Sequence, residues 1–391
     1  MVISNRLASI QPFYVMDILS RAKALERQGR DVIHLEIGEP DFPTPPLVAQ
    51  YAADFARRGD IKYTPAAGLP DLRQAIAKYY RDRYGVQVES ERIFITPGAS
   101  GGFLLAMALV LNEGDKVLLE DPGYPCYSNF VRLFGGIPSL VPVDASTRFH
   151  FNPEILSAVW DRRTKGVVIA SPSNPTGAVL RPDELRALVD DLERRSAFLI
   201  SDEIYHGLEY DEPSSTALAF SDRVLVINSF SKYFGMTGWR VGWLVVPADC
   251  IDNAEKLAQN LFISAPTPSQ YAALASFTEA NLHGLELRRQ VFQERRDFLC
   301  EQLQKIGFSI KTMPSGAFYV YADCSRFTSN SFDFALSLLE ETGVAVTPGK
   351  DFGNNAPERY LRFSYAVTLD RLAAAVERIK FFSERGRHKR A

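Results

Sequence analysis

The stretch that decides the fold is Ser229-Phe230-Ser231-Lys232-Tyr233-Phe234-Gly235-Met236-Thr237-Gly238-Trp239-Arg240-Val241-Gly242. It stands between two apolar segments, residues 224–227 and 243–246, and the first has the composition of a buried strand in a parallel sheet. A lysine at the mouth of such a strand is unusual, because its ammonium group is costly to desolvate. We therefore expect the pKa of Lys232 to fall from about 10.4 toward neutrality, which leaves an amine able to form a Schiff base with an aldehyde.

The same stretch carries groups suited to a phosphate. Ser229 and Ser231 supply hydroxyl donors and Arg240 a positive charge, for a group that carries about −1.5 to −2 charge. A Ser-x-x-Lys match alone is more often a surface loop with a solvated lysine, since short motifs are weak evidence. The rest of the chain therefore has to support the site.

Composition sets the broad class. The chain has 391 residues, 46% hydrophobic and 23% charged, which is typical of a soluble globular protein of two or three domains. The net charge of −3 gives no sign of a nucleic-acid partner or a membrane surface. The four cysteines and five histidines show no metal-ligand spacing, so we expect no metal site.

The longest apolar run, residues 103–111, is about half the length that a membrane helix needs, about 18 residues or more. No basic-then-apolar leader stands at the start of the sequence. We expect a cytoplasmic protein.

From residue 92 onward, apolar strands alternate with helical segments, which predicts a mostly parallel sheet with helices on both faces. The predicted strands cover residues 93–95, 117–119, 167–170, 198–200 and 224–227. In such sheets ligands bind outside the carboxyl ends of the strands. The unusual side chains that follow these ends are Ser100, Tyr124, Asn174, Asp202, Tyr205 and Lys232.

Several of these residues also have plain structural interpretations. The turn 98–101 opens a helix, where free N–H groups bind anions, with Ala99 and Ser100 nearest, but a lone glycine turn is weak evidence. Asp202 needs a cation or hydrogen bonds in a buried strand, or it caps a helix. A loop tyrosine such as Tyr63 is more often packing or surface, and Gly38 lies in what reads as a plain turn.

The pattern of the sequence changes at residue 285. A long charged helix is expected over 285–306, followed by short strands, a helix over 332–342 and a strand-like segment, 360–365, that contains Arg362. An arginine within a strand is usually an edge residue with its head in water. The N-terminal part predicts a helix over 16–28 and a strand over 32–37.

Together, in their order along the chain, these motifs resemble the class I/II pyridoxal-phosphate-dependent aminotransferases of the aspartate aminotransferase superfamily, fold type I. The resemblance extends from about residue 32 to the last helix. It implies an α/β fold, with a large domain around a mostly parallel central sheet flanked by helices and a smaller α+β domain built from both termini. The expected division is an N-terminal arm and part of the small domain (1–46), a large cofactor domain (47–284) and a small C-terminal domain (285–391).

The resemblance also implies roles for single residues around pyridoxal 5'-phosphate. Lys232 is the Schiff-base lysine, and the catalytic set is Lys232, Asp202 and Tyr205. Asp202 faces the pyridine nitrogen, Tyr205 and Asn174 the phenolate oxygen, and Tyr124 the ring face. The phosphate takes Ala99, Ser100, Ser229 and Arg240, together with Tyr63 from the neighbouring subunit of a homodimer. Substrate binding falls to Gly38, Asn174 and Arg362, with Arg362 as a bidentate clamp for the α-carboxylate.

The expected activity is transfer of an amino group from an L-amino acid to a 2-oxo acid by a ping-pong mechanism. Some aspartate-specific relatives carry a lysine in the turn where this chain has Ser100, and an aromatic arm, Phe13-Tyr14, precedes the first helix. These two features favour a neutral aliphatic or aromatic donor, with 2-oxoglutarate or pyruvate as acceptor.

Three alternatives remain open at this point. The same residues serve carbon–sulfur lyases and other β- or γ-eliminating enzymes of this fold. An aminotransferase-like effector domain of a transcription regulator would carry a basic winged-helix module ahead of the sheet, and only about 30 residues precede the first expected strand. A protein that binds the cofactor without turnover would not need the full set of Lys232, Asp202 and Arg362.

Overall fold

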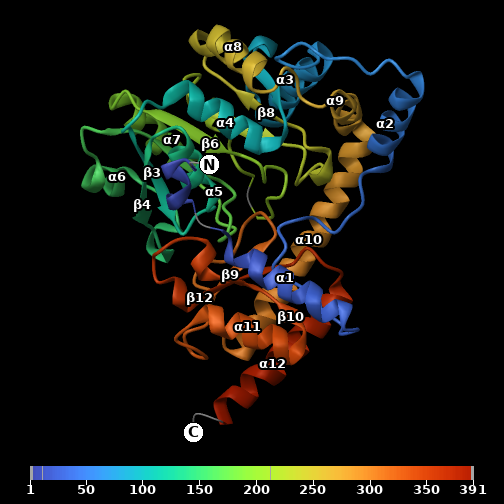
Figure 1. Ribbon diagram of the computed structural model, residues 1–391, viewed down its shortest axis with the longest axis vertical. Coiled ribbons are helices and arrows are strands. Elements are labelled where there is room, and N and C mark those ends of the chain that lie inside the picture. The colour runs from blue at the N-terminus through green and yellow to red at the C-terminus, as the bar shows by residue number, and fades with distance from the viewer. Residues whose placement is uncertain (1–2, 11, 212, 389–391) are drawn as a thin grey trace.

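The computed structural model describes residues 3–10, 12–211 and 213–388, and Figure 1 shows an upper and a lower body joined by a long helix. The upper body is built on a seven-stranded sheet with the order β2-β8-β7-β6-β5-β3-β4. Neighbouring strands are parallel except at β8, which is antiparallel to both β2 and β7. The predicted mostly parallel sheet is thereby confirmed. The strands are β2 (Ile93–Thr96), β3 (Lys116–Asp121), β4 (Ile137–Pro142), β5 (Thr164–Ala170), β6 (Phe198–Asp202), β7 (Leu225–Ser229) and β8 (Gly242–Val245).

Helices cover the sheet because its central strands are apolar on both sides. Every residue of β7 is buried, as is every residue of β2 and β8. α4 (Gly98–Val110) packs on β7 and β8, and α7 (Pro182–Arg194) packs on β6. α7 buries the expected stripe of leucines and valine, while its charged residues other than Asp191 face outward. The helix expected over 103–112 begins earlier, so the glycine turn at residue 98 is the first turn of α4.

The remaining helices of the upper body lie around this core. They are α2 (Pro46–Arg58), α3 (Pro70–Tyr84), α5 (Cys126–Leu133), α6 (Pro153–Val159), α8 (Ile251–Leu261) and α9 (Thr267–Leu274). α2 packs along α9, and α3 also packs on α9, at the upper right of Figure 1.

The lower body is built from both ends of the chain. It holds an antiparallel sheet in the order β11-β12-β9 and a parallel pair, β1 with β10. Its strands are β1 (Ile33–His34), β9 (Tyr319–Asp323), β10 (Val344–Ala345), β11 (Thr347–Pro348) and β12 (Tyr360–Ser364), and its helices are α1 (Tyr14–Arg27), α11 (Ser331–Thr342) and α12 (Leu369–His388). α1 packs on α11, β10 and β11.

The strand expected over 32–37 is only two residues long. The Leu35 carbonyl still accepts from the backbone N–H of Ser364. The Glu36 carbonyl, however, accepts from the side chains of Arg362 and Thr347 rather than from a neighbouring strand. Side-chain donors thus take the place of backbone hydrogen bonds from a neighbouring strand at this point.

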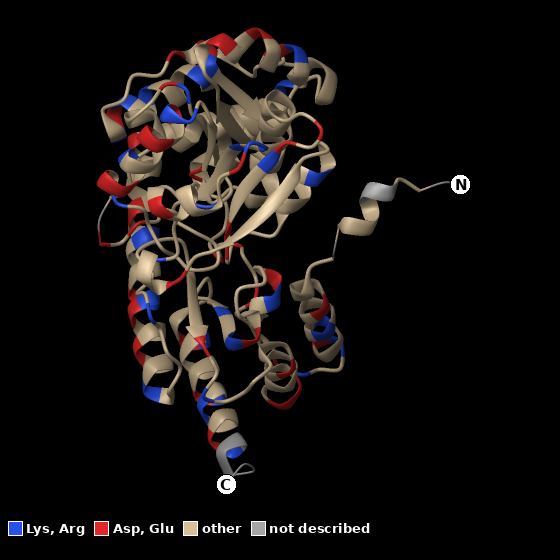
Figure 2. Ribbon diagram, turned by 90° about the vertical axis from the view of Figure 1, so that its left-hand side faces the viewer, with Lys and Arg blue, Asp and Glu red and all other residues tan. Residues whose placement is uncertain are grey.

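A single helix, α10 (Glu279–Ile306), runs from the upper to the lower body, as Figure 1 shows in orange. The expected boundary at residue 285 falls inside this helix, and the division at 46/47 and 284/285 stays a prediction. Positions of basic residues (blue) and acidic residues (red) are interspersed along the ribbon in Figure 2. Within the described part of the chain, no helix is long and apolar enough to cross a membrane.

Candidate active site

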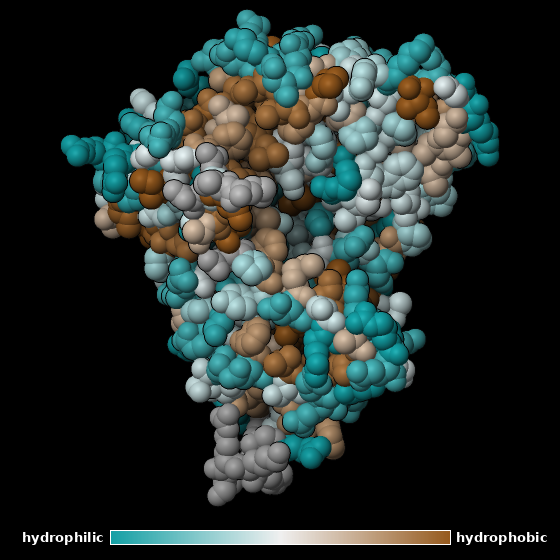
Figure 3. All heavy atoms as spheres, viewed as in Figure 1, coloured by the Kyte–Doolittle hydropathy of each residue, from teal (hydrophilic) through white to brown (hydrophobic). Residues whose placement is uncertain are grey.

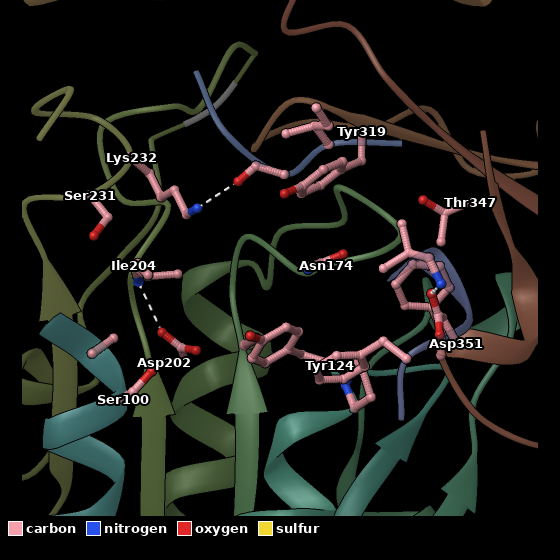
Figure 4. A pocket seen from close by; sticks show the side chains of 18 of the residues that line it. Ser100, Tyr124, Asn174, Asp202, Ile204, Ser231, Lys232, Tyr319, Thr347 and Asp351 are labelled. Atoms are coloured by element: carbon pink, nitrogen blue, oxygen red, sulfur yellow. Dashed lines mark hydrogen bonds between the residues drawn. The ribbon is translucent and has the colours of Figure 1, made fainter. Parts of the chain in front are cut away.

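A cavity of about 380 Å³ lies where the two bodies meet, at the carboxyl ends of the parallel strands. Figure 3 shows a hollow at this level of the molecule, and Figure 4 shows side chains from both bodies pointing into the cavity. Ten of the twelve residues predicted from the sequence line it: Gly38, Ala99, Ser100, Tyr124, Asn174, Asp202, Tyr205, Lys232, Arg240 and Arg362. The convergence expected from the topology is therefore observed.

Lys232 projects from the turn that follows β7. The Ser231 carbonyl accepts from the Thr237 hydroxyl at 2.7 Å, which closes this turn. Lys232 Nζ donates to the Gly38 carbonyl at 2.6 Å. Burial, assisted by the nearby cations Arg240 and Arg362, lowers the pKa of Lys232 to about 8. The predicted fall of this pKa is confirmed in direction.

Positive groups gather beside Lys232 at the start of α4. Gly98 has a φ of +69°, and a Cβ there would lie 2.5 Å from Arg240 Nη2, so only glycine lets the guanidinium approach the helix terminus this closely. Arg240 itself has a φ of 54° and donates to the Thr237 carbonyl at 3.1 Å. Free N–H groups of the first turn, at Ala99 and Ser100, add to a cradle suited to an anion.

Two predicted residues do not line the cavity. Ser229 is buried behind Ser231, with the two hydroxyl oxygens 2.9 Å apart, so that Ser231 rather than Ser229 faces the cavity. Tyr63 is 79% exposed on the surface of the chain. Their roles at a phosphate stay predictions.

Asp202 ends β6 at the base of the cavity. Its carboxylate accepts from the Tyr127 hydroxyl at 2.5 Å and from the backbone N–H of Ile204 at 3.1 Å. Burial raises the pKa of Asp202 to about 6, against the hydrogen bonds and the charge of Lys232, which lower it. A turn and not a helix follows β6 in the described chain, so the helix-cap interpretation does not apply.

Three further predicted residues surround this base. The Tyr205 hydroxyl lies 2.9 Å from that of Tyr319, and Asn174 Oδ1 accepts from Arg362 at 2.9 Å. Tyr124 presents its ring to the cavity and contacts the Tyr127 ring edge-on, with centroids 5.4 Å apart. Figure 4 shows Tyr124 and Asn174 between the Lys232 side and the Thr347 side of the cavity.

Arg362 lies on β12, the middle strand of the lower sheet, and is only 5% exposed. Arg362 is therefore not an edge residue with its guanidinium in water. Nη1 donates to Asn174 of the upper body, and Nη2 donates to the Glu36 carbonyl at 2.5 Å and to the Thr347 hydroxyl at 3.1 Å. The guanidinium also lies 4.3 Å from the centre of the Tyr319 ring.

No acidic side chain in the described chain forms an ion pair with Arg362, and its Nε has no hydrogen-bond partner there. A buried guanidinium without an anionic partner is unfavourable unless a ligand supplies the charge. The planar donor set therefore matches an incoming carboxylate.

Sequence reasoning missed several residues that shape the cavity. Tyr127 and Tyr319 lack a motif of their own and are recognised by their contacts with Asp202 and Tyr205, 75 and 114 positions away in sequence. Thr347 and Phe352 lack one too and are recognised by their contacts with Arg362. Tyr127 lies three residues after Tyr124 at the start of α5, which is the one signal that a turn-and-helix argument could have used.

The outer wall of the cavity is apolar. Residues of α1 and its start line it, together with aromatic residues of α4 and α5: Phe13, Val15, Met16, Leu19, Phe103 and Phe130. The aromatic arm of the sequence thus contributes Phe13 to the wall of the cavity. The cationic side chains among the lining residues are Lys232, Arg240 and Arg362.

Comparison with known proteins agrees with this geometry. The family profile of class I and II aminotransferases matches residues 30–379. A valine–pyruvate aminotransferase of Mycobacterium tuberculosis is 40% identical over 374 residues, which is 95% of this chain and 96% of that protein. A crystal structure of an aminotransferase from Mycobacterium tuberculosis has a TM-score of 0.94 at 39% identity and covers 98% of this chain and 99% of its own. Aspartate aminotransferase from Thermus thermophilus with maleate has a TM-score of 0.92 at 34% identity, covering 97% and 99%.

Proposed function

The chain belongs to the class I and II aminotransferases, and we propose that it transfers the amino group of a neutral aliphatic or aromatic L-amino acid to a 2-oxo acid by a ping-pong mechanism. Transamination with pyridoxal 5'-phosphate is the activity of this family. The observation that carries the proposal is the buried guanidinium of Arg362, which has no acidic partner in the described chain and faces the same cavity as Lys232.

The residues present fit pyridoxal phosphate. Arg240, Ser100 and Ser231 form a cradle at the start of α4 that offers hydrogen bonds and positive charge to the phosphate. The Arg240 guanidinium fits there because Gly98 has no Cβ. Lys232 is near enough to neutrality for covalent attachment. When bound, the cofactor supplies an aldehyde carbon for the amino group and a ring that withdraws electrons from the substrate Cα.

The side chains at the base of the cavity hold the ring. Asp202 would keep a proton on the ring nitrogen, because a cation beside it relieves the burial penalty of its carboxylate. Tyr205 and Asn174 would donate to the phenolate oxygen, and Tyr124 would cover one ring face. Ser229 would support the phosphate site through its contact with Ser231.

Two residues act on the substrate. Arg362 binds the α-carboxylate with two parallel hydrogen bonds and so fixes the orientation of Cα. Lys232 Nζ takes the proton from Cα, which requires the neutral amine that its lowered pKa provides near physiological pH. The Gly38 carbonyl, which accepts from Nζ at 2.6 Å, holds the amine in place.

The charge inventory of the cavity supports a neutral donor. If Arg240 serves the phosphate, Arg362 the α-carboxylate and Lys232 the amine chemistry, the lining residues leave no cation for a side-chain carboxylate. The wall from α1 and the aromatic residues of α4 and α5 suits an apolar side chain. The name of the valine–pyruvate relative agrees with this preference.

Single half-reactions test the proposal. The cofactor-loaded protein is mixed with one amino donor at a time, and loss of the visible absorbance of the lysine-bound cofactor is followed. Leucine, valine and phenylalanine should react faster than aspartate and glutamate, and Lys232→Ala should react with none. A clear preference for an acidic donor would overturn the substrate assignment, and full turnover by Lys232→Ala would overturn the role of the lysine.

We also propose a cytoplasmic homodimer in which Tyr63 reaches the phosphate of the neighbouring subunit. Tyr63 is 79% exposed, and large hydrophobic side chains are exposed nearby in sequence at Tyr51 and Ile61. Leu261, the last residue of α8, and Ile263 are exposed as well. Figure 3 shows hydrophobic residues gathered on the upper part of one face. Exposed apolar surface of this kind is typical of an interface between subunits.

A further inference from the structure

α1 has two apolar faces, although a helix at the edge of a body needs only one. Ile18, Ala22 and Leu25 are buried in the core of the lower body. Val15 and Leu19 lie at i and i+4 on a second face that lines the cavity, and Met16, which also lines it, is 54% exposed. A second apolar face turned toward a cavity indicates contact with a ligand rather than packing.

The start of α1 has no cap of its own. The N-cap residue is Phe13, whose side chain cannot accept a hydrogen bond, so the first N–H groups need another acceptor. Asp351 supplies it from η8 (Gly349–Asp351), which is more than 330 residues away in sequence. Its Oδ1 accepts from the backbone N–H of Tyr14 at 2.6 Å and its Oδ2 from that of Val15 at 2.7 Å.

Asp351 is itself only 6% exposed and lines the same cavity as Arg362. Both carboxylate oxygens are occupied by α1, and Asp351 and Arg362 form no ion pair in the described chain. The negative charge also lies at the positive end of the helix dipole. These two bonds hold the first turn of α1 over the cavity, and the Tyr14 ring adds an edge-on contact with Phe332 of α11.

We propose that Asp351 is a positioning residue for substrate specificity. By holding the first turn of α1, it sets the wall of Val15, Met16 and Leu19 against the side chain of the amino donor. The inference rests on the proposed neutral donor. It adds that α1 is the element that discriminates between donors by the length of their side chain. We expect the side chain of leucine to contact this wall and the methyl group of alanine to end short of it.

The test compares alanine and leucine in wild type, Asp351→Ala and the control Asn152→Ala. Asn152 is the N-cap residue of α6, where its side chain accepts from the Ile155 N–H at 2.8 Å, and it does not line the cavity. For Asp351→Ala we expect kcat/KM to fall roughly tenfold for leucine, the scale of a lost apolar contact, and to stay within about twofold for alanine. Asn152→Ala should leave kcat/KM unchanged for both leucine and alanine.

Two further measurements separate this role from a general structural one. Hydrogen exchange of the amides in residues 14–27, measured without donor, should accelerate in Asp351→Ala and not in Asn152→Ala. In a Val15→Ala/Leu19→Ala background, where the wall is already truncated, Asp351→Ala should have less than about a twofold further effect on leucine.

An equal fall for alanine and leucine would show that Asp351 acts on Arg362 or on the chemistry, and would overturn the inference. Unchanged exchange in α1 would also overturn it. If wild type instead prefers acidic donors, the proposed function fails, and the exchange of α1 still reports separately on whether Asp351 holds the helix.

Discussion

Burial sets the charge of the two residues at the centre of the site. Lys232 has a pKa lowered to about 8, so its amine is half neutral near that pH instead of near 10.5. In cofactor-free protein, the rate at which Lys232 captures the pyridoxal phosphate aldehyde should therefore rise with pH and reach half of its plateau near pH 8. Stopped-flow absorbance measures this rate, with free lysine as the control. A midpoint at the ordinary lysine value, about 10.4, would contradict the assignment.

The pKa of Asp202 is shifted in the opposite direction, because burial raises it from 3.8 to about 6. Between these values the folded protein holds a proton that the unfolded chain releases, so this group lowers stability as pH rises through the window, and the penalty is complete above pH 6. Asp202→Asn should make the cofactor-free protein more stable by about 1–3 kcal/mol at pH 7. The same change should reduce kcat on the order of 10² to 10³, because the ring nitrogen loses its counter-charge.

Denaturant unfolding at pH 7 and pH 5 measures the stability part. The gain should shrink at pH 5, where wild-type Asp202 is largely protonated in the folded state. A variant less stable than wild type at pH 7, or a gap that does not change with pH, would show that burial is not what raises this pKa.

The sequence predicted single residues best where local chemistry was unusual. Lys232 after an apolar strand and Asp202 at a strand end are such cases, and both lie in the cavity. It could not predict the contacts that complete them. Tyr127 reaches Asp202 across 75 positions and Arg362 reaches Asn174 across 188, and no local pattern encodes such pairs.

At the level of elements, the backbone conformation at the N-terminus of α4 determines how closely Arg240 approaches the proposed phosphate site. Gly98→Ala places a Cβ against Arg240 and keeps a positive φ, so it should weaken pyridoxal phosphate binding at least about tenfold, or about 1.4 kcal/mol. Gly114→Ala is the matched control, since Gly114 has a φ of +84° and a Cβ there meets nothing within 4 Å. Both variants should lose about 1–2 kcal/mol of stability from backbone strain.

Equilibrium dialysis of the cofactor, together with thermal unfolding, distinguishes the two effects. Equal affinity in both glycine variants would mean that Arg240 does not contact the phosphate. A stability loss limited to Gly98→Ala would mean that the clash, and not the strained backbone, is what destabilises the helix start.

Elements were predicted well where periodicity was strong and poorly where pairing was short. The strands of the upper sheet and the amphipathic α7 follow from their apolar patterns. The strand expected over 32–37 shrank to β1 because the Glu36 carbonyl accepts from Arg362 and Thr347. α4 starts earlier than expected, since its glycines take the first turn despite their low helix propensity.

At the scale of the whole molecule, the proposed dimer makes a sharp prediction about mixed subunits. Lys232→Ala and Tyr63→Phe proteins should each be impaired. In a hybrid dimer, one site combines an intact Lys232 with an intact Tyr63 only if the tyrosine reaches across the interface. Mixing the two variants by refolding them together should therefore raise activity above that of either alone. No recovery in hybrids verified by mass would place Tyr63 outside the neighbouring site.

The pairing of β1 with β10 has a consequence for how the polypeptide matures during translation. Ile33 leaves the ribosome about 310 residues before its partner Val344, a delay of about 15 to 60 s at ordinary elongation rates. In that interval every strand of the upper sheet has been synthesised, so it can assemble on the nascent chain. Until then α1 and β1 lack this partner strand, and the wall of the cavity that α1 carries is completed only after residue 344 has been synthesised.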